Sequence, residues 1–136
     1  VILYTEQDFE AEVMRLTNGK GVNVVYESVG KTTFDKSLKC VGIRGVLALF
    51  GQASGPVPPV DPLRLWEHSV FLTRPALAQY TLTRSELLER AGDVLEWVMT
   101  GRLKLRISHA LPLKDAAEAH TLLEGRETTG KVLLVP

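Results

Sequence analysis

The stretch NVVYESVGKTTFDKSLKCVGIRGVLALF, residues 23–50, contains the pattern that decides the fold. It begins with a β-branched and aromatic run at residues 23–27, which is typical of a strand and stops at the Ser-Val-Gly turn of residues 28–30. A helix is expected to begin at Thr32 or Thr33 and to end near Gly42, with an apolar face formed by Phe34, Leu38 and Val41. Residues 46–50 are almost continuously apolar, as strands buried on both faces tend to be. This order predicts two parallel strands joined by a crossover helix.

The same alternation continues on both sides of this stretch. Residues 1–4 (VILY) predict a strand, and residues 7–18 predict a helix capped by Thr5 or Asp8. On the other side, the proline-rich residues 51–62 exclude a regular helix or a central strand, and a short helix is expected over residues 62–68. Residues 70–74 (VFLTR) predict a further strand that ends at Pro75.

A different pattern follows residues 75–83, the only candidate domain boundary. Residues 83–86 read as a capping box that begins a long helix with a buried apolar stripe, formed by Leu87, Leu88, Ala91, Val94, Leu95 and Val98. Residues 103–107 alternate as in a strand with one wet face, a helix is expected around Ala119, and residues 131–136 predict a final strand. We therefore expect an α/β protein with a parallel sheet at residues 1–78 and a helix-and-strand segment at residues 79–136.

Composition excludes several classes of function. The chain has 136 residues with 16 basic and 16 acidic side chains, so no net charge favours nucleic acid or an anionic membrane. No run of 18 apolar residues predicts a membrane span. The single cysteine, Cys40, excludes an internal disulfide and fits a reducing, cytoplasmic location, with buried packing favoured over a reactive thiol. The three histidines share no ligand spacing, so no metal site is predicted.

Open parallel sheets bind ligands at the carboxyl ends of their strands. That rule selects Tyr4, the turn 28–30, the segment 50–53 and the strand end 72–74 as a candidate ligand edge. Tyr4 could pack on a flat ring, glycines allow close backbone approach, and Arg74 could pair with phosphate. The alternative is that the glycines serve the turns and that Tyr4 packs on the sheet. Neither a G-x-G-x-x-G fingerprint nor a P-loop is present.

Several segments resemble the C-terminal part of zinc-free quinone oxidoreductases of the medium-chain dehydrogenase/reductase superfamily. They are VVYESVGKTTFDKSLKC, RGVLALFGQASGPVPPVDP, VFLTRP and LKDAAEAHTLLEGRETTGKVLLVP. The resemblance implies a two-domain NADPH-dependent enzyme that reduces a quinone or a conjugated enone. It also implies a set of cofactor contacts, namely Tyr4, Val29, Phe50, Gly51, Gln52, Ala53, Leu72, Thr73, Arg74 and Arg126.

The glycine-rich turn and the catalytic domain that precede this region in the family have no counterpart here. The resemblance therefore implies a partial doubly wound, Rossmann-type sheet that lacks its first strands, in a fragment that is inactive by itself. No catalytic residue is assigned. The expected partner is a second copy bound through the edge strand 70–74. An enoyl reductase acting on acyl thioesters and a non-catalytic α/β structural module remain alternatives.

Overall fold

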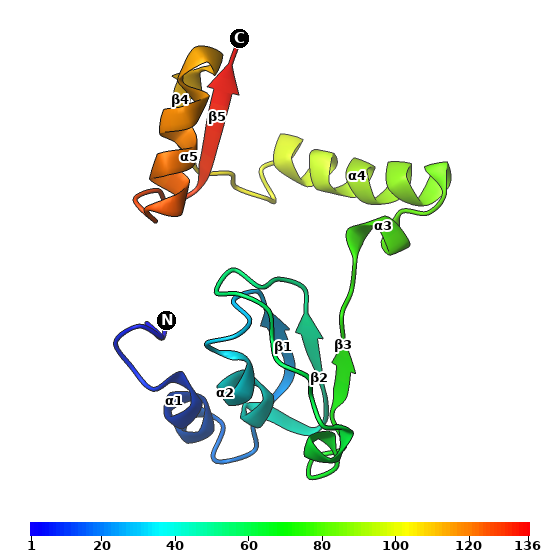
Figure 1. The fold of residues 1–136 in the computed structure, drawn as a ribbon. Coiled ribbons are helices and arrows are strands. Elements are labelled where there is room, and N and C mark those ends of the chain that lie inside the picture. Colours follow the sequence, from blue (N-terminus) through cyan, green and yellow to red (C-terminus); the bar gives the residue numbers. More distant parts are fainter. The chain divides into compact units, whose positions relative to one another are not determined.

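The computed structural model describes residues 1–136, which form two compact units, Val1–Gln79 and Tyr80–Pro136. Each unit contains its own parallel sheet and its own helices (Figure 1). The α/β fold class predicted from the sequence is confirmed.

The first unit is built on a three-stranded parallel sheet. Its strands are β1 (Val22–Glu27), β2 (Val41–Leu49) and β3 (Phe71–Thr73), and they lie in the order β1-β2-β3. The central strand β2 pairs Leu47 with Val25 on one side and with Leu72 on the other. All three strands were predicted, and β2 begins earlier than expected because Val41 continues the ladder to Val22 instead of ending the preceding helix.

Helices of this unit begin where the sequence indicates. Asp8 caps α1 (Phe9–Leu16) by accepting hydrogen bonds from the backbone N–H groups of Glu10 and Ala11. Helix α2 (Phe34–Lys39) packs on β1 and β2, and α1 packs on α2 (Figure 1). The expected short helix after the proline-rich loop is the 3-10 helix η1 (Pro62–Leu65), and the four-residue α3 (Leu77–Tyr80) follows β3 in the chain.

The core of the first unit lies between α2 and the sheet. Phe34 is only 2% exposed and lies in one apolar cluster with Leu38, Val41, Leu47 and Val70. The proline-rich loop closes this cluster, since the partly buried side chains that pack against it include Val57 and Val60. The loop therefore contributes to the core without forming a regular element.

One predicted strand of this unit is wrong. Residues 1–4 form no strand, and Tyr4 lies in a turn. The Leu3 carbonyl accepts hydrogen bonds from the N–H groups of Glu6 and Gln7, which direct the chain into α1. A strand requires a hydrogen-bonded neighbour, and β1, the nearest edge strand, pairs only with β2.

The second unit contains a long helix and a two-stranded parallel sheet. Its elements are α4 (Arg84–Met99), β4 (Ile107–Pro112), the 3-10 turn η2 (Leu113–Asp115), α5 (Ala116–Glu124) and β5 (Lys131–Val135). The capping box is confirmed: Thr83 Oγ1 accepts from the Glu86 N–H, and the Glu86 carboxylate accepts from the Thr83 N–H. Strands β4 and β5 pair in parallel across the α5 crossover.

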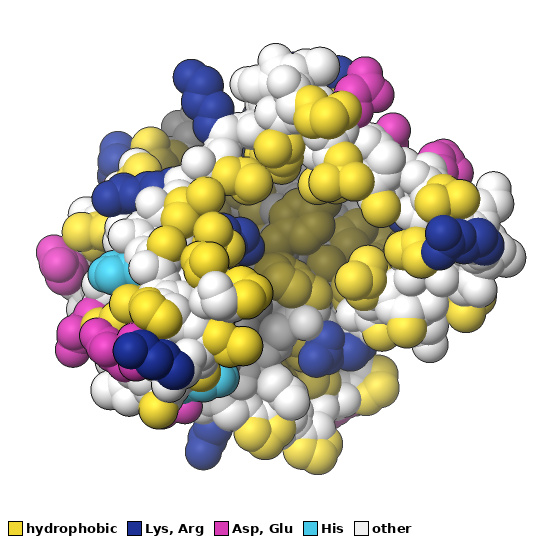
Figure 2. All heavy atoms as spheres, turned by 90° about the horizontal axis from the view of Figure 1, so that it is seen from above, with side chains coloured by type: hydrophobic (Ala, Val, Ile, Leu, Met, Phe, Trp, Pro, Cys, Tyr) yellow, Lys and Arg dark blue, Asp and Glu magenta, His cyan; other side chains and the backbone are white.

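Two expectations for this unit are wrong. The strand expected at residues 103–107 begins only at Ile107, because the ladder to β5 starts with the pair Ile107 and Lys131. The apolar stripe of α4 is not buried, and Leu95 is 62% exposed. The helical period identified the stripe correctly, but no other element of the second unit buries it. Hydrophobic side chains occupy much of the face of the molecule that Figure 2 draws.

No helix in the structure combines the length and the apolar content that a membrane crossing requires.

Candidate functional site

The three parallel strands of the first unit bring their carboxyl ends to one edge of the sheet. Glu27, the last residue of β1, is paired with Leu49 at the end of β2, and Thr73 at the end of β3 is paired with Ala48. The predicted segments 28–30, 50–53 and 72–74 therefore meet along this edge, which we call the carboxyl rim (Figure 1).

Two loops of the carboxyl rim are joined directly by hydrogen bonds. The Phe50 N–H donates to the Glu27 carbonyl over 2.9 Å, and the Ala53 N–H donates to the Ser28 carbonyl over 3.2 Å. Ser54 then uses both its backbone N–H and its hydroxyl to donate to the Val29 carbonyl, each over 2.7 Å. The turn after β1 and the loop after β2 thus form one connected structure.

Tyr4 lies beside this structure although it does not end a strand. It lines a hollow of about 290 Å³ together with Val29, Tyr26 and Phe9. The hollow opens next to the Ser-Val-Gly turn, so Tyr4 and Val29 are brought together as the sequence predicted.

The remaining predicted contacts differ in their placement. The side chains of Gln52, Thr73 and Arg74 are exposed on the rim. Leu72 packs against the hydrophobic core instead. Arg126 lies in the second unit, in the loop after α5, where it adopts a positive φ of 57°.

The glycines of the rim serve contact between the loops. A Cβ on Gly30 would lie 2.7 Å from the Gly55 carbonyl oxygen, and a Cβ on Gly51 would lie 2.5 Å from the Ser28 carbonyl oxygen. The expectation that they let a ligand approach the backbone is therefore not needed to explain these residues. Their missing side chains let the two loops touch.

The buried carboxylate of Glu27 fixes the Ser28-Val29-Gly30 turn through hydrogen bonds. Glu27 is 4% exposed, and its Oε1 accepts hydrogen bonds from the N–H groups of Val29 (2.7 Å) and Gly30 (2.9 Å) and from the Thr33 hydroxyl (2.9 Å). Its Oε2 accepts from the Ser37 hydroxyl. Each oxygen of this charged group therefore has a donor, as a buried carboxylate requires.

These donors decide the charge state of Glu27. Burial alone raises the pKa of the carboxyl, but the hydrogen bonds from Ser37, Gly30, Val29 and Thr33 outweigh it and hold the pKa below its ordinary value. A folded-state pKa below the unfolded value stabilises the fold at neutral pH. This contribution is present above the unfolded pKa and is lost as the pH falls through the folded one.

Sequence reasoning missed the roles of Glu27 and Ser54. A signal for the first was available, because Thr33 and Ser37 are spaced by one helical turn at and after the start of α2, which follows the acidic residue that ends β1. No local pattern marks Ser54, since its partner Val29 is 25 positions away.

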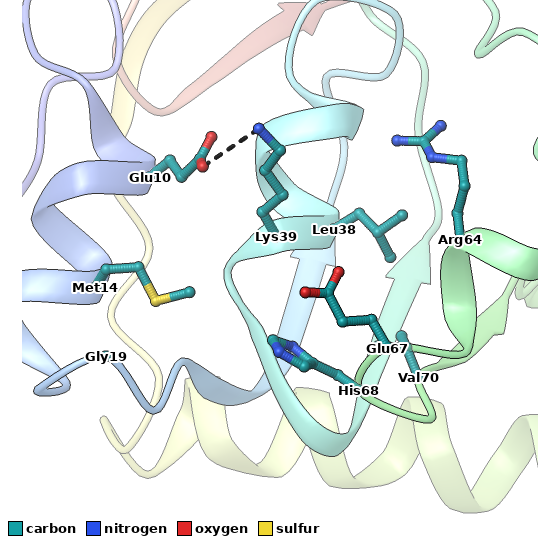
Figure 3. Close-up of a pocket in the computed structure, with 9 residues that line it drawn as sticks. All are labelled: Glu10, Met14, Gly19, Leu38, Lys39, Arg64, Glu67, His68 and Val70. Carbon is teal, nitrogen blue, oxygen red and sulfur yellow. Dashed lines mark ion pairs between the residues drawn. The ribbon is translucent and has the colours of Figure 1, made fainter.

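A larger hollow, of about 530 Å³, lies away from the carboxyl rim (Figure 3). Its lining includes Lys39, His68 and Val70, which precede β2 and β3, so it lies toward the amino ends of these strands. Glu10 and Lys39 form an ion pair over 3.5 Å across part of it. None of the predicted site residues lines this hollow.

The chain offers no metal centre: nowhere along residues 1–136 do three His, Cys, Asp or Glu side chains come together as ligands. Cys40 is free and buried as predicted, and burial raises the pKa of its thiol to about 11. A thiol with such a pKa is a poor nucleophile at neutral pH.

Comparison with known proteins places this geometry in a family. The family model described as zinc-binding dehydrogenase matches residues 1–134. The 2-haloacrylate reductase of a Burkholderia species is 43% identical over 140 residues, which cover 99% of this chain and 41% of that protein. The residues described above do not fit the zinc named in the family's description, because they lack a set of ligands.

Two solved structures are similar to the whole chain. Escherichia coli quinone oxidoreductase complexed with NADPH has a TM-score of 0.93 and 40% identity, covering 100% of this chain and 43% of that one. A mycobacterial protein complexed with NADPH has a TM-score of 0.88 and 48% identity, covering 95% of this chain and 40% of that one. The chain thus spans about two fifths of the length of these relatives. It belongs to the zinc-binding dehydrogenase family, in the part of the medium-chain dehydrogenase/reductase superfamily that contains the quinone oxidoreductases, which confirms the resemblance predicted from the sequence.

Proposed function

We propose that the protein that carries this chain is an NADPH-dependent oxidoreductase that transfers a hydride to a quinone or a conjugated enone. The observation that supports this most directly is the carboxyl rim, where two hydrogen-bonded loops and a hollow lined by Tyr4 lie at the edge of a parallel sheet. Relatives with this fold were solved with NADPH.

The residues of the rim have the chemistry that a dinucleotide needs. The rings of Tyr4 and Phe50 and the side chain of Val29 offer apolar contact, while Gln52 and Thr73 offer exposed polar groups for ribose or amide.

We assign the binding of the cofactor's phosphates to an arginine side chain rather than to the backbone of the turn. The N–H groups of Val29 and Gly30 already donate to Glu27, so the turn has none of these donors left for a phosphate. We assign Arg74, the guanidinium group on the rim, to a phosphate of the cofactor. Arg126 stays a proposed cofactor contact on the ground of the family resemblance. Gly51, Ala53 and Leu72 complete the proposed lining through backbone or apolar contact.

The cofactor supplies the reactive chemistry. When bound, NADPH donates a hydride from its nicotinamide ring to the acceptor. The side chains of this chain bind and orient the cofactor. This orientation supplies a large part of the rate enhancement in such reactions. We assign no general acid or base to the described residues.

A substrate comparison tests this proposal. The protein that carries this chain should oxidise NADPH in the presence of a quinone or a 2-haloacrylate, as followed by the loss of NADPH absorbance, and more slowly with an enoyl thioester. If the thioester is turned over faster than the quinone, the function of the protein is enoyl reduction rather than quinone reduction. Absence of both NADPH binding and NADPH oxidation would overturn the proposal.

We further propose that the protein is a homodimer formed through strand β3. The order β1-β2-β3 leaves one edge of β3 unpaired, and Phe71 on this strand is 64% exposed. Such an edge can pair with its copy across a two-fold axis. We also propose a cytoplasmic location for the protein, because a single free cysteine, Cys40, is compatible with a reducing compartment.

Phe71→Lys is expected to convert this dimer to a monomer, because a charged side chain would be placed at the shared edge. Light scattering measures the mass in solution. Leu16→Lys on α1, another exposed apolar position, is the control and should leave the mass unchanged. A Phe71→Lys protein that keeps the wild-type oligomer mass would refute the interface.

A further inference from the structure

We propose that Ser54 and Glu27 are positioning residues for cofactor binding, which clamp the Ser28-Val29-Gly30 turn to the loop after β2. The inference rests on the proposed function, because it concerns the same rim. It assigns roles to Ser54, which does not line the hollow beside Tyr4, and to Glu27, which borders that hollow but is only 4% exposed.

Glu27 connects the turn to the residues at the start of α2. Its carboxylate accepts from two successive N–H groups of the turn and from the hydroxyls of Thr33, the N-cap residue of α2, and of Ser37 within α2. The turn is thereby tied to the first turns of α2, whose residue Phe34 is anchored in the core. Thr33, the N-cap residue of α2, makes no side-chain hydrogen bond to the helix backbone, and its hydroxyl donates to Glu27.

Ser54 connects the turn to the loop after β2. Its hydroxyl donates to the Val29 carbonyl over 2.7 Å and accepts from the Thr32 N–H over 3.1 Å. The neighbouring Gly55 carbonyl accepts from the Lys31 N–H over 3.2 Å. One serine side chain therefore connects the loop after β2 to both sides of Gly30.

The clamp determines what the turn can present to a ligand. The N–H and the carbonyl of Val29 are both bonded inside the protein, so its side chain is what remains for the hollow shared with Tyr4. Because these hydrogen bonds already order the rim in the free protein, the rim loses less conformational entropy when the cofactor binds. Releasing the clamp should therefore weaken binding without removing any group that contacts the cofactor.

The test compares Ser54→Ala with a matched control. Ser54→Ala removes two hydrogen bonds at the rim and should raise the Kd and the KM for NADPH about tenfold, with kcat changed by less than about twofold. Ser54→Thr keeps the hydroxyl and should restore binding. Thr17→Ala is the control, because Thr17 Oγ1 also donates to a carbonyl (Val13, 2.8 Å) and accepts an N–H (Gly21, 3.0 Å), but before β1, at the opposite edge of the sheet.

The outcomes separate the two proposals. If the wild-type protein binds NADPH and Ser54→Ala binds it as tightly as Thr17→Ala does, the clamp is refuted and the proposed function stands. If the wild-type protein does not bind NADPH, both are refuted. Should Ser54→Ala fail to fold, Glu27→Gln provides the second variant: it keeps the volume of the side chain but gives Ser37 an amide N–H₂ in place of an acceptor. Unchanged NADPH binding by Glu27→Gln would likewise refute the clamp.

Discussion

Phe34→Ala is expected to lower the free energy of unfolding of the first unit by about 4 kcal/mol. Phe34 is the largest side chain among the fully buried residues, and it joins α2 to Leu47 on the central strand. Removing its ring leaves a cavity between a helix and a sheet that are both held by other contacts, so the site cannot fully collapse. Urea unfolding followed by circular dichroism measures the change.

Trp66→Ala is the control for this substitution. Trp66 is also a large aromatic residue but is 81% exposed, so its loss should change stability by no more than about 0.5 kcal/mol. Equal urea midpoints for the two variants would show that the core does not lie between α2 and the sheet.

Gly30→Ala is expected to cost about 3 kcal/mol, the second largest effect. Gly30 has a φ of +88°, and an added Cβ would meet the Gly55 carbonyl oxygen at 2.7 Å and the Gln52 Cα at 2.9 Å. Both atoms belong to the backbone, so neither can move aside as a flexible side chain would. The substitution should therefore push apart the two loops of the carboxyl rim.

Gly19→Ala isolates the conformational part of this cost. Gly19 has a similar φ of +76°, but nothing lies within 4 Å of its added Cβ. It should lose only the left-handed strain, about 1 kcal/mol. Urea unfolding of both variants gives the difference, which is the cost of the steric clash between the added methyl group and the loop after β2. The same loss in both variants would contradict a tight contact at Gly30.

The local patterns of this chain predicted its elements well. Asp8 caps α1, Thr83 and Glu86 form the capping box of α4, and residues 46–49 of the predicted apolar run lie in the central strand. For the two helix caps the determining interaction is within a few residues, so the sequence contains all of it. The strand predicted at residues 1–4 does not form. A strand also needs a hydrogen-bonded neighbouring strand, and the apolar pattern of these four residues does not specify one.

The candidate site divides in the same way. Parallel order alone predicted that the turn 28–30 and the segment 50–53 meet, because parallel strands end at one edge. What joins them could not be predicted: Ser54 bonds to Val29, and Gly30 lies against Gly55.

The sequence by itself determined the α/β class, the helix caps, the buried Cys40 and the family, because these depend on local periodicity and on motifs. Only the tertiary structure decided that Glu27 is a buried, fully hydrogen-bonded carboxylate and that the rim's glycines serve contact between loops. The physical reason is that a buried charge or a close backbone approach depends on which distant atoms surround it, and that is a property of packing rather than of residue order.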